Sequence, residues 1–214
     1  MKITILGSTG FVGKVLVKKA IAAGYQVKTL ARNPEKLEET KDKIEVIKGS
    51  VFETSSVEAA IEGAEIVIST IGPPQGKSCD PCQYEKAMKD IVRAMDKNGV
   101  KRYIHIGGAA HQGGENETWN FNRKFLRLFL SLFARQILIA KHLEWEVLKS
   151  SDLDWTIIRP PRIANEEASG NISVDEKNLI SLKVSVEDLT DFILLQITSK
   201  EWIRKAPLIS SEKK

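Results

Sequence analysis

The segment Gly7 to Gly13 constrains the fold of this 214-residue chain more than any other part of its sequence. It reads Gly7-Ser8-Thr9-Gly10-Phe11-Val12-Gly13, follows the apolar run 2–6, and contains the start of a helical pattern. Glycines at this spacing allow a tight turn and let a helix pack closely on the preceding strand. The helix N-terminus adds partial positive charge and main-chain N–H groups, which suit a pyrophosphate. We therefore expect these seven residues to form the phosphate-binding turn of a dinucleotide site.

Short runs rich in Val and Ile alternate with longer helical patterns over the rest of the chain, as successive strand-helix-strand units do. We expect strands at 2–6, 26–31, 44–48, 65–70, 101–106 and 154–159, with a short last strand at 207–210. We expect helices at 11–23, 34–39, 55–61, 81–98, 120–150 and 186–199, three of them closed by a glycine cap. The pattern predicts one Rossmann-type domain over residues 1–214. It would be a doubly wound parallel α/β sheet with a small C-terminal appendage and an irregular substrate-side segment at 162–184.

The charge balance argues against a nucleic-acid partner. Lys and Arg number 32 against 28 Asp and Glu, which gives a net charge of +4, whereas dedicated nucleic-acid binders cluster far more positive charge. Residues 101–164 hold ten of the basic residues and six of the acidic ones. The whole excess of positive charge therefore lies in this segment.

Two cysteines, Cys79 and Cys82, cannot form a disulfide framework and make only half of a four-ligand zinc site. We expect two reduced thiols and no metal, with a functional dithiol as the alternative. The chain begins directly with a strand pattern and not with a signal sequence. The apolar stretch 125–140 is interrupted by Arg127 and Arg135 and is too short to span a bilayer. These patterns predict a cytoplasmic protein without membrane insertion.

The end of the second expected strand discriminates between nicotinamide cofactors, because an Asp or Glu there accepts hydrogen bonds from the adenosine ribose of NAD. This chain has Arg32 at that position. A guanidinium offers a planar fork of donors that suits the 2′-phosphate of NADP. We therefore expect NADP(H) as the cofactor, with NAD(H) as an alternative. If Arg32 is simply a solvated surface residue, this preference disappears.

Four blocks of the sequence resemble the atypical short-chain dehydrogenase/reductases, the group that includes NmrA-like proteins and the NAD(P)H-binding flavin and biliverdin reductases. The blocks are 7–13, 49–51 with 63–69, 99–104 and 152–161, and the resemblance covers nearly the whole chain. It implies further cofactor contacts at Ser50, Val51, Thr70, Ile71, Gly72, Gly107, Lys141, Pro160 and Ile163. Of these, Ser50 departs from the family, which usually has Asp beside the adenine.

Standard members of this group use a Ser at the end of the fifth strand and a Tyr-x-x-x-Lys on the next helix, where the Tyr donates a proton to a carbonyl. The resemblance puts Lys141 at the lysine, Ile137 at the tyrosine, and Gly107 or Gly108 at the serine. The loss of both hydroxyls argues against carbonyl reduction by this constellation. A flavin or quinone accepts hydride at a conjugated ring and needs positioning more than a proton donor.

The expected catalytic residues are therefore Lys141, Arg162 and His111. Arg162 would clamp an electron-rich acceptor, and His111 lies in the glycine-rich segment after the fifth strand. Each also has an alternative without catalysis, as a solvated lysine, a structural arginine or a loop histidine. The sequence thus predicts an NADP(H)-binding oxidoreductase that passes hydride to a flavin, quinone or similar small-molecule acceptor. The alternatives are a non-catalytic NADP(H) sensor of the NmrA-like type, and an epimerase or dehydratase, which would need a tyrosine base.

The expected helix 120–150 is apolar around most of its circumference. Its polar residues Arg123, Arg127, Ser131 and Arg135 recur every fourth position and leave large apolar side chains on the remaining faces. Such a helix is deeply packed, or meets a second subunit in a homodimer, or touches a membrane surface through its Arg stripe.

Overall fold

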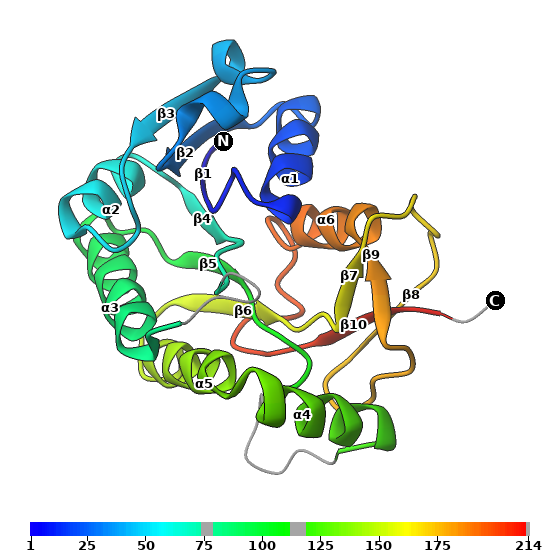
Figure 1. The fold of residues 1–214 in the computed structure, drawn as a ribbon. Helices are drawn as coiled ribbons and strands as arrows, with labels where there is room; N and C mark the ends of the chain where they lie inside the picture. Colours follow the sequence, from blue (N-terminus) through cyan, green and yellow to red (C-terminus); the bar gives the residue numbers. More distant parts are fainter. Residues whose placement is uncertain (74–78, 112–118, 213–214) are drawn as a thin grey trace.

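The computed structural model describes residues 1–73, 79–111 and 119–212. Six parallel strands form the central sheet in the order β3-β2-β1-β4-β5-β6 (Figure 1). They are β1 (Lys2–Leu6), β2 (Gln26–Ala31), β3 (Ile44–Lys48), β4 (Ile66–Ser69), β5 (Arg102–Ile106) and β6 (Asp154–Ile158). The strand order reverses between β1 and β4, which is the place where ligands bind in open α/β sheets. The predicted single-domain Rossmann-type sheet is confirmed.

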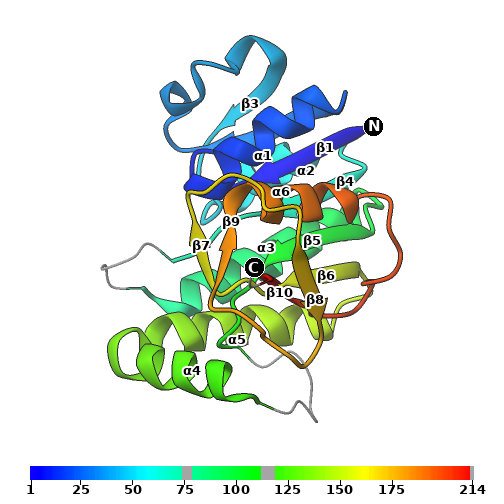
Figure 2. The same cartoon turned by 90° about the vertical axis from the view of Figure 1, so that its right-hand side faces the viewer.

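Helices cover both faces of the sheet (Figures 1 and 2). On one face α1 (Phe11–Ala22) packs against α6 (Val186–Leu195); the other carries α2 (Thr54–Ile61), α3 (Pro81–Lys97) and α5 (Arg135–Lys149). Strand side chains alternate between two apolar cores, so Ile3 and Ile5 face α1 and α6 while Leu6 faces the other helices. The expected helix 34–39 is a 3-10 turn at Pro34–Leu37, followed by a second at Lys41–Lys43.

Two glycines build the turn after β1. Gly7 has a φ of +88°, which L side chains rarely adopt, and a Cβ on Gly13 would lie 2.2 Å from the Gly7 carbonyl oxygen. The first turn of α1 therefore lies directly on the end of β1. The three expected glycine caps, at Gly24, Gly63 and Gly99, also have positive φ values.

The prediction of one helix over 120–150 is wrong. The chain forms α4 (Phe121–Phe133) and α5, which are separated at Ala134, where φ is −147° and ψ is 38°. Neither Gly nor Pro marks this break. The break arises because α5 runs alongside α3 and packs against it, while α4 lies outside the layers of the sheet (Figure 1). Among the described residues no helix is both long and apolar enough to cross a membrane.

The segment 162–184 is more regular than predicted. It contains β7 (Arg162–Ala164) and β8 (Ile172–Asp175), and it leads into β9 (Lys183–Ser185). β7 pairs parallel with β9, and β8 pairs antiparallel with β10 (Leu208–Ser211), the expected last strand. These four strands lie together beside α6 (Figure 2). β7, β8 and β9 are short and pair with partners remote in the sequence, so no local pattern marks these three.

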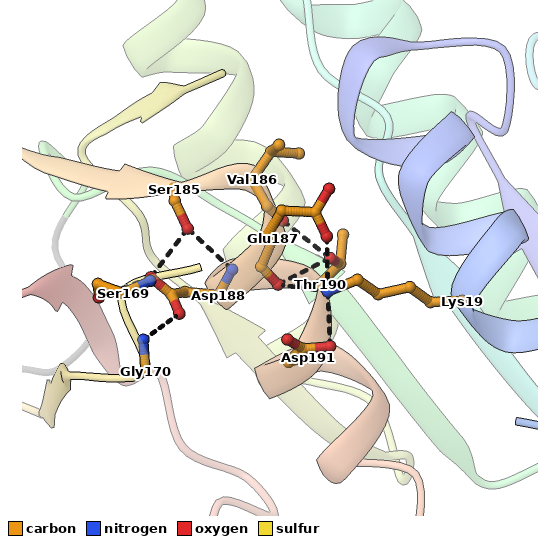
Figure 3. A network of polar contacts seen from close by, with 9 residues as sticks. All are labelled: Lys19, Ser169, Gly170, Ser185, Val186, Glu187, Asp188, Thr190 and Asp191. Atoms are coloured by element: carbon orange, nitrogen blue, oxygen red, sulfur yellow. Dashed lines mark hydrogen bonds and ion pairs between the residues drawn. The ribbon is translucent and has the colours of Figure 1, made fainter. Parts of the chain in front are cut away.

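A buried carboxylate fastens this appendage to α6 (Figure 3). The side chain of Asp188 accepts hydrogen bonds from the backbone N–H of Ser169 at 2.9 Å and from that of Gly170 at 3.1 Å. It also accepts from the hydroxyls of Ser169 and Ser185, both at 2.8 Å. Ser185 caps α6 by accepting from the Asp188 N–H at 2.9 Å. These bonds lower the pKa of Asp188 although burial would raise it.

We predict that Asp188→Ala lowers the free energy of unfolding by about 3 kcal/mol, because it leaves several donors at the α6 N-terminus without their charged acceptor. Asp191→Ala is the matched control on the same helix. Its carboxylate is 59% exposed and pairs with Lys19 at 2.6 Å, an interaction worth under about 1 kcal/mol. Urea unfolding of both variants measures the difference, and equal losses would contradict the role of Asp188.

Candidate functional site

A cleft of about 340 Å³ lies at the carboxyl edge of the sheet. Its walls come from the segments that follow β1, β2, β3 and β4, together with the start of α3. Eight of the expected site residues line it, namely Gly7, Thr9, Gly10, Arg32, Val51, Thr70, Ile71 and Gly72. The fold thus gathers four segments that are far apart in the sequence around one cleft at the strand-order reversal.

The end of the cleft at Gly7, Thr9 and Gly10 is built mainly from backbone. Gly10 is the N-cap of α1, and neither a side-chain cap nor an acidic residue occupies the described first turn of this helix. Its first N–H groups are therefore available to an anion. The Thr70 hydroxyl donates to the carbonyls of Leu6 and Gly7, at 3.2 and 3.1 Å, and holds the β1 and β4 turns together. This arrangement fits a pyrophosphate without any charged side chain.

The opposite end of the cleft combines apolar walls with an exposed cation. Phe52 and Tyr84 make an edge-to-face contact with ring centroids 5.3 Å apart, and Arg32 stands exposed at the rim. Such walls suit an adenine ring with a phosphate beside it. Sequence reasoning missed the lining residues Leu30, Gly49, Phe52, Cys79, Asp80, Gln83 and Tyr84. Only Leu30 and Gly49 carried a usable signal, since both stand at ends of expected strands.

Other expected contacts lie behind or beside the cleft. The Ser8 side chain is buried and its hydroxyl lies 2.5 Å from that of Thr29, while Val12 and Gly13 are buried under the turn. Phe11 opens α1 and is 49% exposed. The Ser50 hydroxyl accepts from the Phe52 N–H at 3.2 Å and so shapes the turn after β3.

Lys141 belongs to a buried charged group at the ends of β4 and β5. Its ammonium lies 2.8 Å from the Glu144 carboxylate and donates to the carbonyls of Ile71 and Ile106, at 3.2 and 3.3 Å. The other member is His105, whose Nε2 lies 3.2 Å from the same carboxylate. Because Ile71 lines the cleft, the hydrogen bond from Lys141 to its carbonyl places this buried group next to the cleft wall.

Electrostatics within this group favour a charged Glu144 and a neutral His105. Burial alone would raise the pKa of Glu144, but the Lys141 ammonium and His105 outweigh it and lower that pKa to about 2. Burial lowers the pKa of His105, and the Lys141 ammonium lowers it further. Lys141 and Glu144 are thus an ion pair with an imidazole beside it. Sequence reasoning identified Lys141 and missed Glu144, although the two stand three residues apart on one helix face.

The expected contacts at β5 and β6 lie close together. Gly107 donates its N–H to the carbonyl of Ile158 at 2.8 Å, and a Cβ on Gly107 would lie 2.8 Å from the Ile157 side chain. A serine at Gly107 would therefore require Ile157 to move. Pro160 is buried and accepts from the Ala109 N–H at 2.9 Å.

None of the three expected catalytic residues is among the residues that line the cleft, and only Lys141 bonds to one of them, Ile71. The His111 ring is 8% exposed and packs against the rings of His142 and Trp145, with centroids 5.8 and 5.7 Å away. Arg162 is exposed at the start of β7, and Ile163 packs on the α1 side of the core. The structure thus bonds Lys141 to the lining residue Ile71 and leaves Arg162 and His111 apart from the lining.

Two buried arginines hold the segment after β5. Arg123 donates to the carbonyls of Ala109 and His111, both at 3.1 Å, and its guanidinium lies over the Trp119 ring. Arg159 donates to the carbonyls of Ala206, His111 and Glu176, at 2.6, 2.9 and 3.0 Å. Part of the positive charge of 101–164 is therefore structural.

The two cysteines are both free. Burial raises the pKa of the Cys79 thiol, so this group stays protonated at neutral pH. Asp80 accepts from the Cys82 N–H at 3.0 Å and caps α3, with Pro81 in its first turn. Within the described residues no cluster of three or more His, Cys, Asp or Glu side chains could hold a metal ion.

Comparison with known proteins identifies the family of the chain that carries this cleft. A family model described as NAD(P)H-binding matches residues 7–200, which include the turn after β1 and every strand of the central sheet from β2 onward. The chain belongs to the NAD(P)H-binding family. Its resemblance to the atypical short-chain dehydrogenase/reductases is thereby confirmed, and its cofactor is a nicotinamide dinucleotide.

Relatives of this NAD(P)H-binding protein include oxidoreductases and epimerase-like proteins. YhfK from Bacillus subtilis, described as an uncharacterized sugar epimerase, is 26% identical over 216 residues, which are 96% of this chain and 92% of YhfK. The structure of the oxidoreductase ylbE from Lactococcus lactis is 25% identical with a TM-score of 0.81, over 100% of this chain and 92% of ylbE.

A short-chain dehydrogenase/reductase from Veillonella parvula, solved in complex with NADP, shares the fold. Its TM-score is 0.77 at 18% identity, over 98% of this chain and 94% of that one. The chain spans only 57 to 65% of the length of three plant relatives that it also matches.

We predict that Glu144→Gln in this NAD(P)H-binding protein lowers the free energy of unfolding by about 3–5 kcal/mol, because it leaves the buried Lys141 ammonium without its counter-charge. The control is Glu146→Gln on the exposed side of α5, with an effect within about 0.5 kcal/mol. Thermal and urea unfolding measure both.

The pH dependence provides a second readout of the same ion pair. Since the folded pKa of Glu144 is about 2 against a usual 4.5, its contribution to stability is complete above pH 4.5 and is lost as the pH falls towards 2. The Glu144→Gln variant should lack this part of the acid dependence. An unchanged acid profile would show that the pair does not stabilise the fold.

Proposed function

We propose that this protein is an NADP(H)-dependent oxidoreductase that passes hydride to a flavin, a quinone or a similar conjugated acceptor. The observation that carries the proposal is a contrast at the sheet edge. The buried Lys141 ammonium donates to the carbonyl of Ile71, which lines the cleft, while the two positions that carry hydroxyls in standard relatives hold Gly107 or Gly108 and Ile137. Carbonyl chemistry would need a proton donor there. Reduction of a conjugated ring does not, because the proton can come from solvent after hydride transfer.

The chain's own residues would bind and orient. Gly7 to Gly10 and the first N–H groups of α1 would hold the pyrophosphate, and the walls at Phe52 and Tyr84 would hold the adenine. When bound, the reduced nicotinamide supplies the hydride. Lys141 would orient the nicotinamide ribose and present positive charge to an acceptor that gains negative charge. Arg162 would act only from the start of β7, and His111 from the segment after β5, as outer contacts of the acceptor.

Arg32 supports NADP(H) over NAD(H). It follows β2 directly, it is exposed, and it lines the adenosine end of the cleft, where an NAD-binding protein would carry a carboxylate. An exposed guanidinium keeps its donors available for a phosphate dianion. Within the cleft lining, Arg32 is the only Lys or Arg side chain among the described residues.

We expect Arg32→Gln to weaken NADPH binding about 10- to 100-fold, the range for losing charge-assisted hydrogen bonds, and to change NADH binding less than about twofold. Titrations followed by nicotinamide fluorescence measure both constants. Arg93→Gln is the control, because Arg93 is 66% exposed and lies outside the cleft lining. Equal losses for the two cofactors would refute a phosphate contact.

Turnover tests the function itself. We expect steady NADPH oxidation with at least one acceptor from a panel of riboflavin, FMN and quinones. The double variant Lys141→Met/Glu144→Leu removes both charges together, so that neither is left buried without its counter-charge, and it should reduce kcat/KM about a hundredfold. Lys149→Met, at the exposed end of α5, is the control.

The competing function is a non-catalytic NADP(H) sensor. The observation in its favour is that the Lys141 ammonium is already bonded to Glu144 and to two carbonyls, so little of its donor capacity remains. NADPH binding without turnover across the whole panel would favour the sensor and contradict the oxidoreductase. An epimerase is disfavoured because the tyrosine-base position holds Ile137.

A further inference from the structure

One face of α4 is a row of large apolar side chains that points away from the protein. Phe121, Phe125, Leu128 and Leu132, here called the α4 ridge, are 80%, 55%, 61% and 70% exposed. Their spacing of four, three and four residues places them in one line along the helix. Burial would stabilise each by about 1.5–3 kcal/mol, so the ridge is an unusual feature for a surface helix.

The attachment of α4 fixes this orientation. Arg123 is fully buried, and Leu126 packs on the small apolar cluster of Ala109, Leu179 and Leu208. At 100° per residue these two positions lie on the side of the helix opposite the ridge. Asn120 caps the helix and also donates to the Leu179 carbonyl at 2.8 Å. The helix is therefore held by one face, and the ridge is directed outward.

The charges beside the ridge have one sign. Lys124 and Arg127 are exposed on one flank, Arg135 follows at the start of α5, and the sequence has no Asp or Glu between Trp119 and Leu143. Trp119 lies next to Arg127, with its ring 5.0 Å from the guanidinium. Large apolar residues on one face with Lys, Arg and Trp beside them are typical of helices that lie in the headgroup region of a bilayer.

Self-association explains the ridge less well. Four side chains with these exposures offer roughly 500 Å² of surface, while a stable dimer buries about 800 Å² on each partner. Pairing two copies through the ridge would also bring two sets of Lys124, Arg127 and Arg135 together without an acidic residue on either helix. An anionic lipid surface needs no minimum area and attracts the same cations.

We propose that α4 binds the surface of an anionic lipid bilayer, with the α4 ridge among the acyl chains nearest the headgroups and Lys124, Arg127 and Arg135 at the phosphates. The proposal goes beyond the oxidoreductase function and does not depend on it, because it uses none of the residues that line the cleft. It describes peripheral binding by a helix that lies along the surface, and not a membrane span.

Co-sedimentation with vesicles tests the proposal on the full chain. We expect binding to phosphatidylcholine vesicles that contain about 30% phosphatidylglycerol and little binding to phosphatidylcholine alone. Raising the NaCl concentration from about 0.1 to about 0.5 M should weaken binding strongly, because it shortens the screening length. Equal binding to the two vesicle types, or binding to neither, would overturn the proposal.

Paired variants separate the two contributions. Lys124→Gln/Arg127→Gln should lower the partition coefficient about fivefold per charge, and Phe125→Ser/Leu128→Ser about tenfold per side chain. Leu195→Ser is the matched control, since Leu195 on α6 is 61% exposed, as Leu128 is. Circular dichroism melts confirm folding of every variant without reference to cofactor or turnover.

Sedimentation equilibrium decides between lipid and a second copy of the chain. Under the proposal the protein without lipid stays monomeric at micromolar concentration. A dimer that Phe125→Ser/Leu128→Ser converts to monomer, while Leu195→Ser does not, would show that the ridge is an interface between copies and would overturn the proposal.

Discussion

The close approach of α1 to the end of β1 is the contact on which the rest of this structure depends. At Gly13 a single added carbon would lie 2.2 Å from the Gly7 carbonyl oxygen, so the helix begins where the strand stops. That position directs the first N–H groups of α1 along the carboxyl edge of the sheet. Thr70 then joins the β4 turn to the same point through the Leu6 and Gly7 carbonyls. The cleft is a consequence of this junction.

Buried cations from the second half of the chain hold the segments that follow β4 and β5 at the carboxyl edge of the sheet. Lys141 ties Glu144 and two strand ends together, and Arg123 and Arg159 both bind the carbonyl of His111. A buried guanidinium with several carbonyl acceptors satisfies polar groups that a loop would otherwise expose to apolar surroundings. The excess positive charge of residues 101–164 therefore stabilises loops as well as favouring an anionic ligand, which composition alone could not distinguish.

The sequence could predict the features that depend on neighbouring residues, and not those that depend on contacts between remote segments. Strand and helix positions around the sheet depend on local apolar periodicity and on glycine caps, so the bounds of β1, β2 and β3 were predictable to the residue. The turn after β1 was predictable because its form depends on local backbone geometry at its glycines. Tyr84 and Glu144 were not, because their places depend on how α3 and α5 pack against each other. The strands β7, β8 and β9 escaped prediction because each is only three or four residues long and pairs with a strand remote in the sequence.

The break at Ala134 separates α5, which carries Lys141 towards the cleft wall, from α4, which carries the α4 ridge. A straight helix over residues 120–150 would be about 45 Å long, whereas α3, its neighbour, has 17 residues and is about 25 Å long. The part that matches α3 is α5, which is held there by Trp145 and Leu148 and carries Lys141 to the strand ends. The remaining part lies beyond the helices that cover the central sheet (Figure 1). It turns away at Ala134 and attaches by Arg123 and Leu126, with its most apolar face in solvent. An apolar face that the fold itself cannot bury is a surface for something outside the chain, and the cations beside it select an anionic one.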